Sequence, residues 1–189
     1  MRFPHEDGKK LADEDCKRFY KLFFTLLDYV NDKTKANPNV RNIAKAKSID
    51  PYDVQTVVNV LWERPDLIDG FLKDSLSLSE RDLELVSSWK RCVIGNFILD
   101  RILKKGAILI SVETKEVYQV SGIISTWGEM FGLARLPVVF KTALMPFEGV
   151  IITNSLLLTS NLIIGRNMAK AFREIYLNAK NTGMVHTKL

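Results

Sequence analysis

Histidine and cysteine are the scarcest chemically reactive residues of this chain, which has two of each in its 189 residues. The histidines, His5 and His186, lie in the terminal segments, where a side chain is hard to hold rigidly. A Ser–His or Cys–His nucleophilic site needs a base fixed within hydrogen-bonding distance, and a tetrahedral metal centre needs several such ligands. We therefore expect no catalytic residue of this kind and no metal site.

The two cysteines, Cys16 and Cys92, are far apart in the chain and show no CxxC spacing. Cys16 falls on the apolar face of an expected helix, and Cys92 opens an expected strand. We interpret both as small buried hydrophobic side chains, and a disulfide or a reactive thiol are the alternatives. This use of cysteine indicates a reducing compartment, so we expect a cytoplasmic protein.

Signal peptides, membrane spans and nucleotide-binding loops are also missing from the sequence. The polar N-terminal segment has no apolar signal core. The longest uncharged run, residues 149–165, is shorter than the roughly 20 residues of a spanning helix and contains several polar residues. Neither GxGxxG nor GxxxxGK[ST] occurs. We expect no membrane partner and no cofactor, and we find no internal repeat.

Positive charge is concentrated in the second half of the chain. Residues 1–89 carry 14 Lys/Arg and 16 Asp/Glu, whereas residues 90–189 carry 13 and 6. The first part therefore has a net charge of −2 and the second of +7. Part of this asymmetry can bring the two parts together, and the remainder can face an anionic partner.

The first 89 residues have the three- and four-residue apolar spacing of helices. We predict a first helix over 9–34, a second starting at Asp50-Pro51, a third at Pro65 and a fourth from Ser79 to about Trp89. Residues 41–47 form either a short basic helix or an ordered loop. Around residues 41–61 the pattern loosely suggests helix-turn-helix, but its Val-rich second helix is of the buried kind.

After Trp89 the apolar pattern becomes that of strands joined by tight turns. We predict strands at 93–103, 107–112, 117–122, 137–145, 149–155 and 158–164. Residues 122–134 are an irregular connection, Pro146 to Gly149 breaks the chain between strands, and a last helix covers 167–180. That helix should bury Met168, Ala171, Phe172, Ile175 and Ala179, with a frayed tail after Asn181.

The predicted fold is α+β: an N-terminal helical lobe (1–89), then a six-stranded antiparallel sheet or partly closed barrel with a C-terminal helix (90–189). Several strands are apolar on both faces, as in Ile108-Leu109-Ile110. Either helices must cover the outer face of the sheet, or the sheet must curl into a barrel. Sequential strands in short hairpins favour an antiparallel meander.

Five segments of the chain resemble a family of uncharacterised bacterial proteins with no assigned activity: FYKLFFTLLDYVN (19–31), LWERPDLIDGFL (61–72), SWKRCVIGNFILDRILKKGAILI (88–110), VYQVSGI (117–123) and LPVVFKTALMPFEGVII (136–152). The resemblance implies a bacterial or phage setting in the cytoplasm. The family pattern has Tyr-Asp-Gly after the strand of Ile151 and Ile152. Here Thr153-Asn154-Ser155 stands instead, so no acidic role transfers.

Two basic clusters are the candidate binding sites. Arg166, Lys170 and Arg173 follow i, i+4, i+7 spacing and form one face of the last helix, whose N-terminus favours anions. Arg101, Lys104 and Lys105 surround a predicted turn. The alternative for each cluster is a solvated outer surface. Tyr118 and Trp127 could offer base-stacking surfaces, although sheet aromatics are more often core residues.

We therefore expect a non-catalytic binding or interaction module, with an unknown protein or nucleic acid as its partner. Binding of nucleic acid or another anion through the basic second half is the sharper hypothesis. Self-association into a homo-oligomer is a further alternative. From another functional class, a small carboxylate-dependent hydrolase using Asp100 and Glu129 stays open, although a carboxylate among cations is usually ion-paired.

Overall fold

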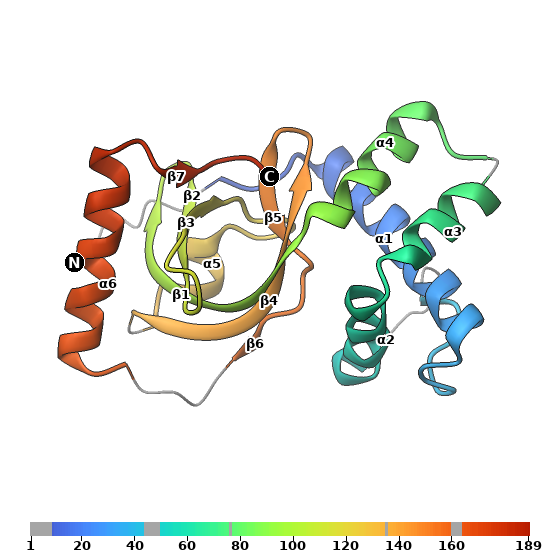
Figure 1. Cartoon of the computed structure of the whole chain (residues 1–189), viewed down its shortest axis with the longest axis horizontal. Coiled ribbons are helices and arrows are strands. Elements are labelled where there is room, and N and C mark those ends of the chain that lie inside the picture. Colours follow the sequence, from blue (N-terminus) through green and yellow to red (C-terminus); the bar gives the residue numbers. More distant parts are fainter. Residues whose placement is uncertain (1–8, 44–49, 76, 135, 160–163) are drawn as a thin grey trace. The chain divides into compact units, whose positions relative to one another are not determined.

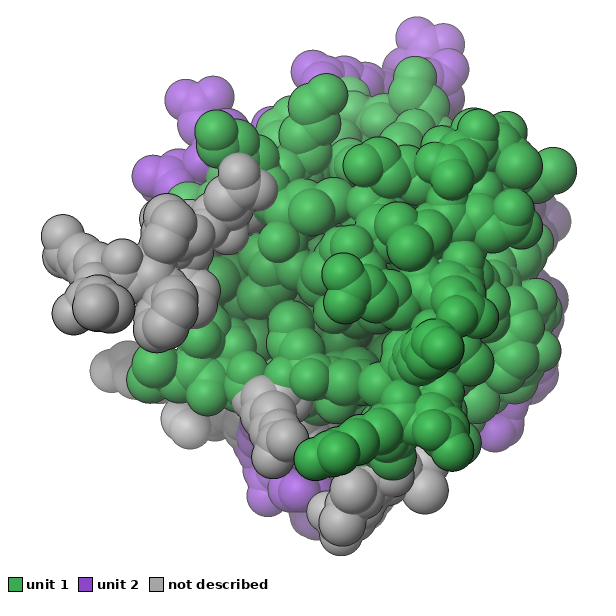
Figure 2. Space-filling model, turned by 90° about the vertical axis from the view of Figure 1, so that its left-hand side faces the viewer, with its two compact units in different colours: residues 1–11, 91–189 green, residues 12–90 purple. Residues whose placement is uncertain are grey.

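The computed structural model describes residues 9–43, 50–75, 77–134, 136–159 and 164–189. The chain divides into two compact units (Figure 1), which are coloured separately in Figure 2. The sheet unit contains residues 1–11 and 91–189, and the helical unit contains residues 12–90. Residues 9–11 pair with the sheet, and the division into 1–89 and 90–189 stays a prediction. Within the described ranges, no helix has both the length and the apolar character needed to cross a bilayer.

The described part of the helical unit contains four α-helices: α1 (Asp13–Thr34), α2 (Pro51–Glu63), α3 (Asp66–Asp74) and α4 (Glu80–Ser88). A 3-10 turn at Trp89–Arg91 follows α4. The predicted helix starts at Asp50 and Ser79 are confirmed. The Asp50 carboxylate accepts the N–H of Tyr52, and the Ser79 hydroxyl accepts the N–H of Asp82. Val54, Val57, Val58 and Leu61 are buried as predicted.

The first helix begins later than predicted, because the residues before it pair with the sheet. Leu11 N–H donates to the carbonyl of Gly122 (3.1 Å), and Gly122 N–H donates to the carbonyl of Lys9 (2.8 Å). These bonds hold residues 9–11 extended, and α1 begins only at Asp13. The open choice between helix and loop for 41–47 falls mainly on residues 44–49, which lie outside the described part of the chain.

The sheet is mixed, and the prediction of an antiparallel meander is wrong. The described strands are β1 (Val93–Leu103), β2 (Gly106–Ser111), β3 (Val117–Val120), β4 (Val138–Phe147), β5 (Val150–Thr153), β6 (Leu158–Thr159) and β7 (Val185–His186). β3 pairs in parallel with both β5 and β7, and the other pairs are antiparallel. Short hairpins in the sequence do not determine which strands become neighbours. β5 pairs with β4, as a hairpin requires, and also with β3.

Strand pairing returns to its starting point through β1. Residues 93–99 of β1 pair with β4, and residues 97–103 pair with β2. The register shifts between Leu99 and Arg101, an irregularity that bends one long strand so that it serves two neighbours. The order is β1-β2-β3-β5-β4-β6, with β7 beside β3, and β4 also pairs with β1. The β4-β1-β2-β3 part has the order of a Greek key.

The apolar interior of this ring is closed at one end by a short helix. Inward residues of five strands, among them Phe97, Leu109, Val120, Phe140 and Ile151, form one buried cluster. Residues 122–134, predicted as irregular, contain the helix α5 (Trp127–Phe131), which begins with a capping box between Thr126 and Glu129. Its Trp127 ring lies 5.9 Å from the Phe140 ring in a stacked arrangement.

The outer face of β1–β3 is covered by the C-terminal helix α6 (Arg166–Asn181), seen in red beside the sheet in Figure 1. Phe172, Tyr176 and Ala179 pack on outward isoleucine and valine side chains. The Arg101 guanidinium lies 4.0 Å from the Tyr176 ring centroid, and Lys115 Nζ lies 4.9 Å from that of Phe172. Apolar residues on both faces of the strands are thus explained by a covering helix as well as by ring closure.

Several details of the predicted last segments are wrong. Met168 and Ala171 are exposed, because the buried face of α6 follows Phe172, Tyr176 and Ala179. Pro146 and Phe147 belong to β4, and the turn is confined to Glu148 and Gly149, which both have positive φ angles of 45° and 80°. The strand predicted for 158–164 appears as β6, and residues 160–163 lie outside the described ranges.

The tail after Asn181 is also ordered, contrary to prediction. Val185 and His186 form β7 beside Val117 and Tyr118 of β3. The His186 ring stacks on the Tyr118 ring at 5.1 Å, and Val185 packs against the cluster under α6. The tail is therefore held by backbone pairing and by side chains on both of its faces.

Gly106, at the turn into β2, is a position where a side chain should prevent closure of the ring. Its φ is +129°, and an added Cβ would lie 2.4 Å from the carbonyl oxygen of Val120. We expect Gly106→Ala to lower the free energy of unfolding by about 3 kcal/mol, because strain and overlap with the backbone add. Urea denaturation followed by circular dichroism measures this change.

Gly165→Ala is the matched control, because an added Cβ there has no neighbour within 4 Å and the φ angle of −69° is ordinary. We expect this N-cap substitution to change the stability by less than about 1 kcal/mol. Equal effects of the two substitutions would contradict the assigned geometry of the β1–β2 turn.

Candidate functional site

A polar hollow of about 290 Å³ lies beside the C-terminal end of β3. We call it the lysine hollow, and it is lined by Lys9, Lys105, Gln119, Ser121, Val150 and Thr187. These residues come from five separate stretches: the N-terminal segment, the β1–β2 turn, β3 and the residue after it, the start of β5, and the C-terminal tail. The fold thus surrounds one small volume with side chains that are distant in sequence.

Strand alternation explains why β3 directs polar groups to this side. Tyr118 and Val120 belong to the interior cluster, so Gln119 between them faces outward. Ser121 follows directly, and its N–H donates to the Ile151 carbonyl at 2.8 Å. Lys9 is placed by its carbonyl, which accepts the Gly122 N–H. Each of these positions is therefore fixed by the backbone.

The lysine hollow is positively charged. Lys9 and Lys105 make no ion pair with any described residue, and none of the lining residues is acidic. A third lysine, Lys188, follows Thr187 and places its Cε 3.9 Å from the position of a Cβ added to Gly149. An acidic residue, Glu148, immediately precedes Gly149 in the same β4–β5 turn. Two cations, Lys9 and Lys105, thus line a small volume that has hydroxyl and amide groups in its wall, and Lys188 follows the lining residue Thr187.

Ser121 is the least exposed polar residue of the wall. Its relative exposure is 5%, and its hydroxyl has no hydrogen-bond partner among the residues that the structure describes. Ser121 Oγ is not among the buried side-chain atoms of the described residues that lack a partner, so it is open to the hollow. A bound group inside the hollow can provide that partner.

The tail that contributes Thr187 and Lys188 is held by a small polar cluster. Tyr118 Oη donates to Glu116 Oε2 at 2.8 Å, and His186 Nε2 lies 3.9 Å from Glu116 Oε1. Hydrogen bonds from the hydroxyls of Tyr118 and Thr114 hold the pKa of Glu116 below its usual value. Burial, with the Glu116 carboxylate beside it, raises the pKa of Tyr118. Glu116 is therefore an ionised anchor for the tail at neutral pH.

The sequence-predicted basic residues fall into three groups. Lys104 and Lys105 form the exposed β1–β2 turn, and Lys105 lines the hollow. Arg101 is instead ion-paired with Asp100 at 2.6 Å and covers Tyr176. Arg166, Lys170 and Arg173 are exposed on α6, and none of them lines the hollow. One predicted turn thus belongs to the site, and the predicted helix face is a separate surface.

Sequence reasoning missed Lys9, Gln119, Ser121, Thr187 and Lys188. The strand period shows that Gln119 faces away from the apolar side chains beside it, but nothing in the sequence indicates that both terminal segments lie at the end of β3. That placement depends on pairing of Lys10 with Gly122 and of β7 with β3. These are contacts between residues far apart in the chain.

Other expected chemical groups have structural roles. Tyr118 and Trp127 are 3% and 1% exposed, so they offer no stacking surface. The Glu129 carboxylate accepts the backbone N–H of Thr126, which lowers the pKa of Glu129. Cys16 and Cys92 form no disulfide in the described structure and are half-buried, and burial raises the pKa of Cys92 to about 11. Among the described residues, no group of three or more His, Cys, Asp or Glu side chains could hold a metal ion.

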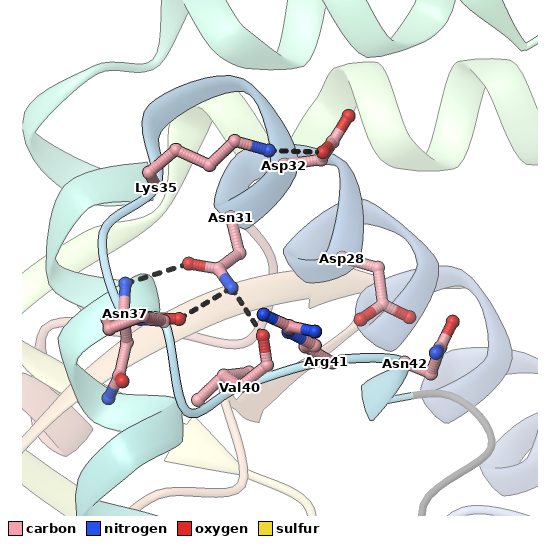
Figure 3. A pocket seen from close by; sticks show the side chains of 9 residues that line it. Asp28, Asn31, Asp32, Lys35, Asn37, Val40, Arg41 and Asn42 are labelled. Carbon is pink, nitrogen blue, oxygen red and sulfur yellow. Dashed lines mark hydrogen bonds and ion pairs between the residues drawn. The ribbon is translucent and has the colours of Figure 1, made fainter.

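A larger hollow of about 490 Å³ lies in the helical unit, between the last turns of α1 and the loop that follows (Figure 3). Its polar groups bind one another. Asn31 Nδ2 donates to the carbonyls of Asn37 (2.9 Å) and Val40 (2.6 Å), and Asn31 Oδ1 accepts the Asn37 N–H. Lys35 pairs with Asp32. These contacts stabilise the loop, and the wall carries both signs of charge, so the lysine hollow is the better candidate.

No protein-family model, curated protein or solved structure matches the chain. The resemblance to uncharacterised bacterial proteins therefore adds no residue assignment, and the geometry of the sheet unit carries the argument on function.

The Glu116 anchor gives a prediction for acid stability. Its pKa is lowered in the folded protein, so its contribution is fully present above the ordinary glutamate pKa of about 4.3 and is lost as the pH falls through the lowered value. We expect Glu116→Gln to destabilise the protein at pH 7, and we expect the difference from the native chain to shrink below pH 4. Urea unfolding at a series of pH values measures it.

Glu174→Gln, at an exposed position of α6, is the control and should leave the pH dependence unchanged. A Glu116→Gln effect that persisted at the same size below pH 3 would show that the carboxylate charge is not what anchors the tail.

Proposed function

We propose that the protein is a non-catalytic binding module whose ligand is single-stranded nucleic acid. The observation that carries this proposal is the pair of lysines, Lys9 and Lys105, that line one hollow from two separate segments, with Lys188 next in sequence to the lining residue Thr187. Lysines in such a group repel one another, and their placement is favourable when an anion lies between them. Phosphate groups of a nucleic acid backbone are anions of suitable size and spacing.

The strand connectivity supports the same class of ligand. Five strands in a Greek-key ring, with β1 bent to close it, correspond to a partly closed barrel of the OB type. Barrels of this type bind oligonucleotides on the face of strands 2 and 3 and on the loops between strands 1 and 2 and between strands 4 and 5. This is an analogy at the level of fold, and it applies here because Lys105 stands on the β1–β2 turn and Lys188 lies beside Gly149 of the β4–β5 turn.

The covering helix limits where a ligand can bind on that face. α6 buries Ile98, Ile108, Ile110 and Val117 on the outer side of β1–β3. What stays accessible is the end of β3 with the β1–β2 and β4–β5 turns, where the lysine hollow lies. We therefore place the ligand at this end, and we expect contacts with its backbone to dominate, because Tyr118 and Trp127 are buried and offer no surface for base stacking.

Two other functions have weaker support. The exposed face of Arg166, Lys170 and Arg173 on α6 is a second basic surface, but none of these residues lines the lysine hollow. A carboxylate-dependent hydrolase would need a free acid, whereas Asp100 is ion-paired and Glu129 caps α5. Self-association stays a prediction, and the exposed apolar residues Ile124, Met130 and Leu133 around α5 are where it could be sought.

The test is binding of a fluorescein-labelled oligothymidylate, measured by anisotropy at several salt concentrations. Three lysine–phosphate contacts predict a slope of log K against log salt of about −2, or about a twentyfold loss of affinity between 50 and 200 mM salt. In Lys105→Glu/Lys188→Glu we expect at least a tenfold weaker affinity at 50 mM salt and a slope reduced to about −0.7.

Lys170→Glu/Arg173→Glu is the matched control, because it changes the net charge by the same amount at the α6 face. We expect it to weaken binding by less than about threefold. Absence of salt-dependent binding by the native chain would remove the proposed function. If Lys170→Glu/Arg173→Glu lost more affinity than Lys105→Glu/Lys188→Glu, the binding surface would be assigned to α6.

A further inference from the structure

The lysine hollow differs from a groove that tracks a continuous strand. Its lining comes from five separate stretches of chain, and its volume is small. An internal phosphodiester has sugars on both sides, so the nucleic acid strand must leave the hollow in two directions. The terminal phosphate of a nucleic acid strand needs only one such opening. At about 290 Å³ the hollow lies just below the usual range for small-ligand pockets, so it has room for one terminal group of a polymer.

We propose that the hollow receives a terminal phosphate monoester of the single-stranded ligand. This inference rests on the proposed function and names the part of the ligand that enters the site. Lys9 and Lys105 supply the positive charge from two sides of the wall. Ser121, Gln119 and Thr187 supply neutral hydrogen-bonding groups, and Val150 contributes an apolar contact.

The number of charges favours a monoester over an internal diester. A phosphate monoester carries between one and a half and two negative charges at pH 7 and has three terminal oxygens, whereas a diester carries one charge. Two lysines without ion pairs among the described residues match a doubly charged group. Hydrogen bonds to charged oxygens are about twice as strong as neutral ones, so each donor in the wall adds discrimination.

Ser121 provides the independent observation. Its hydroxyl is in the wall, the residue is 5% exposed, and no described residue accepts from it or donates to it. A phosphate oxygen within the hollow can accept a hydrogen bond from this hydroxyl. The backbone N–H of Ser121 is already used by Ile151, so Ser121→Ala removes the hydroxyl and leaves the strand pairing intact.

The experiment compares three labelled oligothymidylates of one length, with a 5′-phosphate, with a 3′-phosphate or with hydroxyls at both ends, against the native chain. We expect one phosphorylated oligonucleotide to bind about tenfold more tightly than the unphosphorylated one. In Ser121→Ala and in Lys9→Gln this preference should fall to about threefold or less. Ser87→Ala, in α4 of the helical unit, is the control and should retain the tenfold preference.

Two further arms identify the source of the effect. Lowering the pH from about 7.5 to about 5.5 protonates the monoester, whose second pKa is about 6, and should reduce the preference without abolishing binding of the unphosphorylated oligonucleotide. Inorganic phosphate should reduce the extra affinity of the phosphorylated oligonucleotide and leave the affinity of the unphosphorylated one unchanged. Equal, salt-dependent binding of all three oligonucleotides would overturn this inference and leave the proposed function standing. Binding of none of them would overturn both.

Discussion

Simultaneous pairing of β1 with two neighbours is the constraint on which the sheet unit depends. One strand of eleven residues supplies its first part to β4 and its last part to β2, with the register irregularity near Asp100 between them. Pairing of β1 with both neighbours closes the strand order on itself. With it, the apolar side chains of β1 to β5 enclose one interior, and the turns at one end come together. Polar side chains from five segments meet at that end because the ring is closed.

The α+β class and most of the element positions were predictable from periodicity and capping chemistry. Asp50-Pro51 and Ser79 marked helix starts, and the runs from Val93 onward marked strands, because these signals act within a few residues. The order of the strands was not predictable in this way. Whether β3 meets β4 or β5 depends on how β1 bends and on which faces α6 covers, and these are contacts between distant residues. The face of α6 was misjudged for a related reason: Tyr176 is held by Arg101 from another element.

In the candidate site, too, some residues were predictable from local sequence signals and others depend on contacts between distant segments. Lys104 and Lys105 were identifiable as a basic turn from the sequence, and Gln119 stood out as a polar residue within an apolar strand. Lys9, Ser121 and Thr187 carried no signal, because a lysine near a terminus and a serine after a strand are common and usually solvated. Their significance arises only from position. Arg101 shows the opposite case, since its positive charge suggested binding while the fold uses it to pair with Asp100.

The helical unit is one continuous stretch, residues 12–90, placed in the chain between Lys9–Leu11 and β1. This arrangement has a consequence for folding during synthesis. The helical unit is complete once residue 90 has left the ribosome, and its contacts are local enough to form early. The sheet unit has to wait: its first segment pairs with Gly122, and its β3 gains its last neighbour only when Val185 and His186 emerge. The nascent chain therefore carries a finished helical unit while the ring is still open, and the lysine hollow forms last of all.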